Sequence, residues 1–121
     1  DEAKAAKWFR NAAEQGHDKA QYNLGVALTK GEGVSKSETE AAKWNRKAAE
    51  QGISLAQWNL AVALANGNGV ARDEIEAAKW LRKAAEQDFA AAQFALGVAL
   101  ANSEGVAKDE VEAANLGMVL A

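Results

Sequence analysis

Few residues of this 121-residue chain could perform catalysis. It has one histidine, His17, and no cysteine, so the sequence predicts neither a histidine cluster nor a thiolate site for a metal. Its serines fall in expected loops or helix starts, outside the S-x-x-K and G-x-S-x-G patterns of serine nucleophiles. The segments GEGVSK and GNGVAR lack the full glycine pattern of a phosphate-binding loop. We therefore predict no enzyme activity, no catalytic residue, no cofactor and no metal.

The composition argues against a nucleic-acid partner and against insertion into a membrane. The net charge is −3, whereas a nucleic-acid binder needs a basic surface to displace counterions from phosphates, so we expect no nucleic-acid partner. No apolar run is long enough to span a bilayer, and we expect no membrane insertion. The absence of cysteine leaves the cellular compartment open, because exported proteins can also lack disulfides. The chain starts at Asp1 and has Met118 as its single methionine, which suggests a fragment or a processed form.

A repeated segment organises the whole chain. Trp8, Trp44 and Trp80 recur every 36 residues within AAKWFRNAAEQG, AAKWNRKAAEQG and AAKWLRKAAEQD. The segments AQYNLGVALTKGEGV, AQWNLAVALANGNGV and AQFALGVALANSEGV alternate with them in the same register. Such a period predicts stacked structural units. We divide the single domain, residues 1–121, into an incomplete unit 1–16 and units of about 17–52, 53–88 and 89–121, the last with a divergent final helix.

Each unit reads as two helices. Apolar residues at i, i+4, i+7 and i+8 from Ala56 mark the first helix, and a G-x-G-V turn follows it. Asp73 is a suitable N-cap for the second helix, and Gly52 is a suitable end for the previous one. Asp88 takes the place of that glycine in the next unit, which should cost stability if the backbone there is left-handed.

The motif A-Q-aromatic-x-L-G, then G-x-G-V, then E-A-A-K-W-x-R-K-A-A-E-Q-G resembles the Sel-one-like repeat (SLR) family, a relative of the tetratricopeptide repeat. The resemblance covers nearly the whole chain. It implies an all-α, right-handed α/α superhelical solenoid whose concave side receives a protein or peptide, and so an adaptor or scaffold. The proline that commonly follows G-V in the family is replaced by Ser35, Ala71 and Ala107.

One face of the first helix of each unit is the candidate binding surface. At 100° per residue, the first unit places a lysine and asparagine stripe on that face, and its counterparts follow in later units. A repeated aromatic position faces either the neighbouring repeat or this groove. The predicted partner-binding residues are Lys19, Tyr22, Asn23, Val26, Lys30, Trp58, Asn59, Asn66, Phe94 and Asn102. An ordinary solvated surface remains the competing interpretation of the stripe.

The second helix of each unit should be mainly structural. Trp8, Trp44 and Trp80 fall in its apolar arc, and we predict that all three pack in the core. Asn45 is unusual because Phe9 and Leu81 occupy the same position in the other units. We expect Asn45 to lie at the rim of the core or to bond a neighbouring backbone group, since a buried amide needs partners.

The C-terminal segment raises an alternative function. Its apolar residues Leu116, Met118, Val119 and Leu120 point nearly all round the expected helix, so part of it should be covered by protein. The alternative is therefore a structural module that self-associates through its ends. A more remote alternative, a hydrolase of the β-lactam-binding type, finds neither the cysteines nor a nucleophile motif in this chain.

Overall fold

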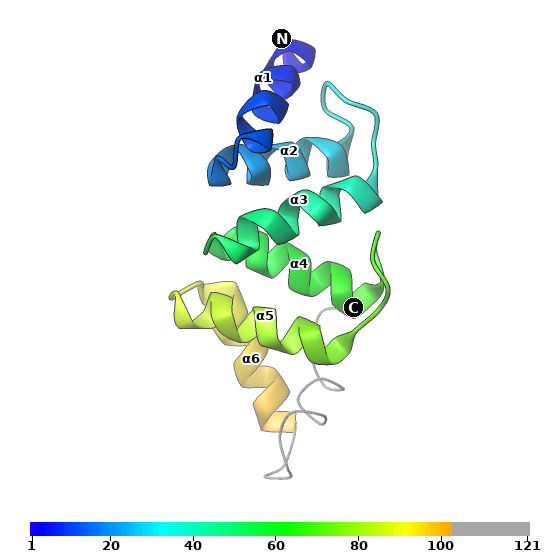
Figure 1. The fold of residues 1–121 in the computed structure, drawn as a ribbon. Helices are drawn as coiled ribbons and strands as arrows, with labels where there is room; N and C mark the ends of the chain where they lie inside the picture. The colour runs from blue at the N-terminus through cyan, green and yellow to red at the C-terminus, as the bar shows by residue number, and fades with distance from the viewer. Residues whose placement is uncertain (103–121) are drawn as a thin grey trace.

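The structure, a computed structural model, describes residues 1–102, which form six helices and no strand. The helices stack in chain order along one axis, with the longer loops after α2 and α4 on one side and the short turns on the other (Figure 1). This confirms the predicted all-α repeat solenoid. The helices are α1 Glu2–Glu14, α2 Asp18–Lys30, α3 Glu38–Glu50, α4 Ser54–Asn66, α5 Glu74–Glu86 and α6 Ala90–Asn102.

Polar side chains cap the first turn of α1, α2, α3 and α5. Ser37 Oγ accepts a hydrogen bond from the Glu40 amide at 3.1 Å, and Asp73 Oδ1 accepts one from the Glu76 amide at 3.0 Å. His17 caps α2 in the same way, since its Nδ1 accepts from the Ala20 amide at 3.2 Å. Each cap satisfies one amide that has no partner within its helix. The sequence predicted the Asp73 cap correctly and gave His17 no role in capping.

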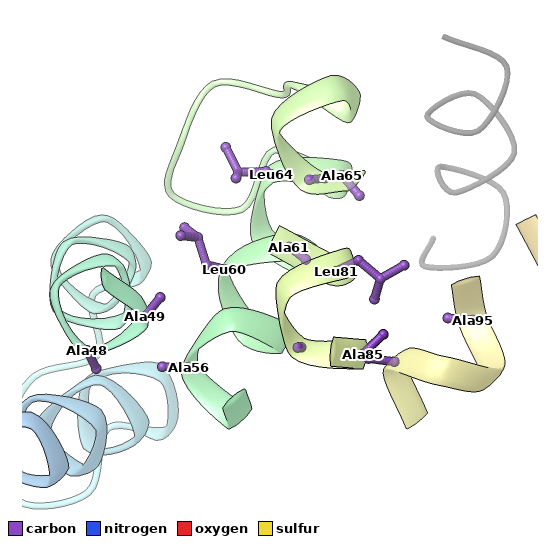
Figure 2. Close-up of a cluster of buried hydrophobic side chains, with 13 residues drawn as sticks. Ala48, Ala49, Ala56, Leu60, Ala61, Leu64, Ala65, Leu81, Ala85 and Ala95 are labelled. Carbon is purple, nitrogen blue, oxygen red and sulfur yellow. The ribbon is translucent and has the colours of Figure 1, made fainter. Parts of the chain in front are cut away.

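Small side chains form most of the buried core. Alanines of α3, α4, α5 and α6 lie between the helices, with a few leucines among them (Figure 2). Leu24, Leu60 and Leu81 are fully buried, whereas the other buried apolar positions are mostly alanine. An alanine contact lets helix axes approach to the near end of the usual range, about 8–10 Å. Each helix therefore packs mainly against the helix before it and the helix after it in the chain.

Polar contacts tie one repeat to the next. Arg10 on α1 donates to Glu40 on α3 at 2.7 Å, and the Trp44 indole donates to the same carboxylate at 3.4 Å. One unit later, Arg46 donates to Glu76 at 2.6 Å, and Trp80 donates at 3.1 Å. The hydrogen bond from the arginine is the largest cause that lowers the pKa of each glutamate below its ordinary value, and partial burial opposes it.

Buried glutamines make a second set of ties. Gln21 and Gln57 are buried on α2 and α4, and their Nε2 atoms donate to the Ala13 and Ala49 carbonyls at 3.2 and 3.1 Å. Each also accepts a 2.8 Å hydrogen bond from a glutamine 30 residues further along the chain. No role was predicted for these glutamines, although a glutamine recurs at this position in each unit, as Gln21, Gln57 and Gln93.

Two glycines allow the loops after α2 and α4 to contact the first residues of α1 and α3, respectively. Gly33 and Gly69 have φ of +74° and +73°. A Cβ at either position would overlap a backbone carbonyl, that of Glu2 for Gly33 and that of Glu38 for Gly69. These sites therefore need glycine for both its conformation and its lack of a side chain.

The prediction that all three repeat tryptophans pack in the core is wrong for Trp8. Trp44 and Trp80 are half-buried against core residues that include the preceding helix pair. Trp8 is 69% exposed, because no helix pair precedes α1 in the described part of the chain. Lys4 also stands where Glu40 and Glu76 stand in the later units, so Trp8 lacks the carboxylate that accepts from its counterparts.

Asp88 provides a test of local strain. Its φ is +64°, whereas the equivalent Gly52 has φ +98°. We expect Asp88→Gly to raise the free energy of unfolding by about 1 kcal/mol, because glycine adopts this conformation without a Cβ penalty. Gly52→Asp should lower it by a similar amount. Urea unfolding measures both. A neutral or destabilising Asp88→Gly would mean that the 3.4 Å contact from Gln93 outweighs the strain.

The glutamate ties predict a pH dependence of stability. Because Glu40 and Glu76 have lowered pKa values in the folded state, their contribution is complete above the ordinary value of 4.5. It is lost as the pH falls through their folded pKa values. The double variant Glu40→Gln/Glu76→Gln should lose less stability than the wild type between about pH 6 and pH 3. Thermal unfolding across this range tests it, with exposed Glu50→Gln/Glu86→Gln as the control. Equal slopes for wild type and the first variant would contradict the assignment.

Candidate binding groove

A central cleft with a volume of about 440 Å³ opens between α2, α3 and α4. Two of its walls carry side chains of the predicted stripe on α2 and α4. The third wall is formed by α3, which the prediction did not include. The lining residues are Tyr22, Val26, Thr29 and Lys30 from α2, Glu38, Ala41, Ala42 and Asn45 from α3, and Trp58, Asn59, Val62, Ala63 and Asn68 from α4 and the loop after it.

A second, outer cleft of about 250 Å³ lies one repeat earlier, at α1 and α2. Each of its lining residues precedes a residue of the central cleft by 36 positions, so the same hollow recurs in register with the helices. Val26 lines both clefts, which makes them neighbours along one groove. The outer cleft is lined by Glu2, Ala5, Ala6, Phe9, Asn23, Val26, Ala27 and Glu32.

Aromatic side chains at the repeated position form part of the groove and part of the core. Tyr22 and Trp58 both line the central cleft, and both are half-buried against the core formed by α3 to α6. The Trp58 ring also lies 5.8 Å from the Phe89 ring, centroid to centroid, at 46°. Tyr22 and Trp58 therefore do both things that were considered for this position: they pack between repeats and they line the groove.

Two matched positions differ between the clefts: Phe9 is replaced by Asn45, and Glu32 is replaced by Asn68. Phe9 gives the outer cleft an aromatic side chain at the first of these positions, whereas Asn45 gives the central cleft an amide. Asn45 is only 7% exposed, and its Oδ1 accepts no hydrogen bond from any described residue. The backbone hydrogen bond offered as one alternative is therefore absent for this oxygen, and the side chain lies where the buried core meets the cleft.

The central cleft carries charges of both signs. Lys30 from α2 and Glu38 from α3 both line it, together with the amides of Asn59 and Asn68. Thr29 also lines it, but its hydroxyl already donates to the Gly25 carbonyl at 2.9 Å. The cleft therefore offers several hydrogen-bonding groups without a surplus of one charge.

The structure brings together six of the predicted binding residues in these two clefts, five in the central cleft and Asn23 in the outer one. Lys19, Asn66 and Phe94 lie outside both clefts, and Phe94 is 74% exposed. The side chain of Asn102 and the apolar residues Leu116, Met118, Val119 and Leu120 lie outside the described residues. The α3 residues Glu38 and Asn45 were not predicted as binding residues, although Asn45 differs in polarity from its counterparts.

Other kinds of site have no counterpart in the described residues. Within residues 1–102, no group of three or more histidine, cysteine, aspartate or glutamate side chains is placed to hold a metal ion. Over the same residues, no helix has the length and apolar character needed to cross a membrane. The groove is thus the feature on which the functional argument rests.

The Sel1 repeat family model matches residues 1–17, 18–53, 54–89 and 90–116, which together cover almost the entire chain. The chain belongs to the Sel1 repeat family. Two of the matched Sel1 repeat segments, 18–53 and 54–89, start at α2 and α4 and so contain one complete helix pair each. They begin one residue later than the units drawn from the sequence.

Solved Sel1 repeat structures agree with this assignment. A Sel1 repeat protein from Oxalobacter formigenes is 41% identical over 81% of this chain, with a TM-score of 0.75. A protective antigen of uropathogenic Escherichia coli strains, described as displaying an SLR fold, is 40% identical over 98% of this chain, with a TM-score of 0.77. This chain spans 40% and 25% of the lengths of those two chains. No curated protein matches it.

Proposed function

We propose that this Sel1 repeat chain is a non-enzymatic adaptor that binds a protein or peptide segment along the groove of α2 and α4. The observation that carries the proposal is the recurrence of one cleft in successive repeats, at equivalent positions. Because equivalent clefts follow one another along the groove, an extended peptide could place successive side chains in successive clefts. Membership of a family that typically mediates protein–protein interactions supports the same function.

The lining chemistry also supports a peptide partner. Tyr22 and Trp58 offer large aromatic surfaces, and aromatic residues are enriched where protein interfaces gain most of their binding energy. Asn59 and Asn68 can donate to and accept from a peptide backbone. Such a mixture of apolar walls and a few polar groups is typical of sites that bury a ligand.

A selection experiment tests the groove. A phage-displayed library of random linear peptides is selected against the wild-type chain, and binders are measured by calorimetry on purified variants. Asn59→Arg should weaken binding at least tenfold, because its longer charged side chain fills the central cleft. The matched control is Asn11→Arg on α1, an exposed asparagine outside both clefts, which should bind normally. A library that yields no binder, or binders insensitive to Asn59→Arg, would contradict the proposal.

The alternative of self-association has one observation in its favour and one against it. Trp8 is exposed on α1, where an equivalent tryptophan in later repeats is half-buried against a preceding helix pair, so this face can be covered by another protein surface. Lys4 opposes a simple continuation of the stack, because it stands where Glu40 and Glu76 accept from an arginine, and an ammonium group cannot accept that hydrogen bond. Self-association through α1 therefore remains the second candidate.

Light scattering separates this candidate from the adaptor. If copies associate through α1, the wild type should show a concentration-dependent rise in mass that Trp8→Glu abolishes, since a buried carboxylate without a partner is strongly unfavourable. Asn59→Arg should leave that rise unchanged. A constant monomer mass for the wild type up to about millimolar concentration, the range in which weak contacts appear, would rule out this form of assembly.

A further inference from the structure

The outer cleft differs in charge from the central cleft. Glu2 and Glu32 both line the outer cleft, and no lysine, arginine or histidine does. At the matched positions of the central cleft, Glu38 is accompanied by the neutral Asn68, and Lys30 adds a positive charge to the lining. The outer cleft is therefore negatively charged, whereas the charges of the central cleft cancel.

Neither carboxylate of the outer cleft has a partner of its own. Within residues 1–102, the side chains of Glu2 and Glu32 form no ion pair and no hydrogen bond. Glu40 and Glu76, by contrast, each accept a hydrogen bond from an arginine of the preceding repeat. Both glutamates of the cleft are exposed, so a ligand can reach their oxygen atoms. The two carboxylates are thus available to a cationic group from outside the chain.

Backbone packing holds these two glutamates at the same end of the cleft. Gly33 lies against the first residue of α1, where a Cβ would overlap the Glu2 carbonyl, and Glu32 directly precedes this glycine. The contact places the two acidic residues near each other although their charges repel. A cation bound between the carboxylates would replace this repulsion with attraction.

The rest of the lining suits the stem of a long side chain. Phe9 and Val26 are half-buried in the outer cleft, and Ala6 and Ala27 are buried. Lysine and arginine pack their methylene groups along such apolar surface, and an aromatic ring attracts their charged ends. The volume of about 250 Å³ lies below the usual range for pockets that hold a small molecule, about 300–1,000 Å³. A single side chain is therefore a better match for this cleft than a separate ligand.

We propose that the outer cleft is a subsite for a lysine or arginine side chain of the bound partner. The stem of that side chain packs against Phe9, and its charged end lies between the carboxylates of Glu2 and Glu32. The central cleft, in which the charges cancel, does not make the same selection. This inference rests on the proposed function, because it names one side chain that the peptide groove selects.

Peptide selection tests the preference. Random 12-residue peptides displayed on phage are selected against the wild type and against Glu2→Gln/Glu32→Asn, whose second change reproduces Asn68 of the central cleft. Peptides selected on the wild type should share a position rich in lysine and arginine, and those selected on the variant should not. The control Glu50→Gln/Glu86→Gln alters the net charge equally at exposed positions outside both clefts, so the basic position should persist there.

Calorimetry on one selected peptide separates charge from shape. Norleucine in place of its lysine keeps the straight stem and removes the ammonium group. This change should weaken binding to the wild type about tenfold, as expected for two partly exposed ion pairs, and should leave binding to Glu2→Gln/Glu32→Asn nearly unchanged. Raising the sodium chloride concentration from about 50 mM to about 500 mM should reduce the difference between the two peptides on the wild type, because salt screens exposed charges.

The outcomes distinguish this inference from the adaptor function. Peptides that are sensitive to Asn59→Arg but have no basic position, or whose basic position persists on Glu2→Gln/Glu32→Asn, overturn the cationic subsite and leave the adaptor function standing. A saturable heat when calcium chloride is titrated into the free wild type, absent in that double variant, also overturns it, because the carboxylates then hold a metal ion. Failure to select any peptide sensitive to Asn59→Arg contradicts the adaptor function itself, and the subsite with it.

Discussion

The close approach of alanine-lined helices is the constraint on which the other features depend. A pair of 13-residue helices with so few large apolar side chains cannot bury a core alone, and each pair relies on the next. The small contacts bring consecutive helices near enough for glutamine and arginine side chains to reach across a repeat boundary. The same spacing leaves the hollows between α1, α2, α3 and α4 that form the groove.

Much of the fold can be predicted from the sequence because the helix starts, helix ends and turns of each repeat are set by residues within that repeat. The glycine pattern, the Asp73 cap and the 36-residue period predict helix pairs, and the structure places α2, α4 and α6 at that period. Reasoning by repeated position fails where neighbours differ. Trp8 and Trp80 occupy equivalent positions, but within the described residues a helix pair precedes Trp80 and none precedes Trp8, so the two side chains differ in exposure. Burial is a property of the neighbours as well as of the residue.

Only part of the groove could be predicted from the sequence, because its lining depends on which helices lie next to one another. A spacing of 100° per residue is enough to find one face of α2 and α4, and it identified Lys30 and Asn59. The opposite wall belongs to α3, and its contribution depends on how the helices cross, which the periodicity of one helix does not contain. The polarity of Asn45 against Phe9 and Leu81 was visible in the sequence, but its position in a cleft and its lack of a donor required the arrangement of three helices.

The shared residue Val26 has a consequence for how a bound segment is positioned. A solenoid of identical repeats would allow its ligand to slide by one unit and find the same contacts again. Here such a shift exchanges the amide of Asn45 for the ring of Phe9 and the amide of Asn68 for the carboxylate of Glu32. These two positions break the translational symmetry of the groove, so a segment that spanned both clefts would meet different side chains after a shift of one repeat.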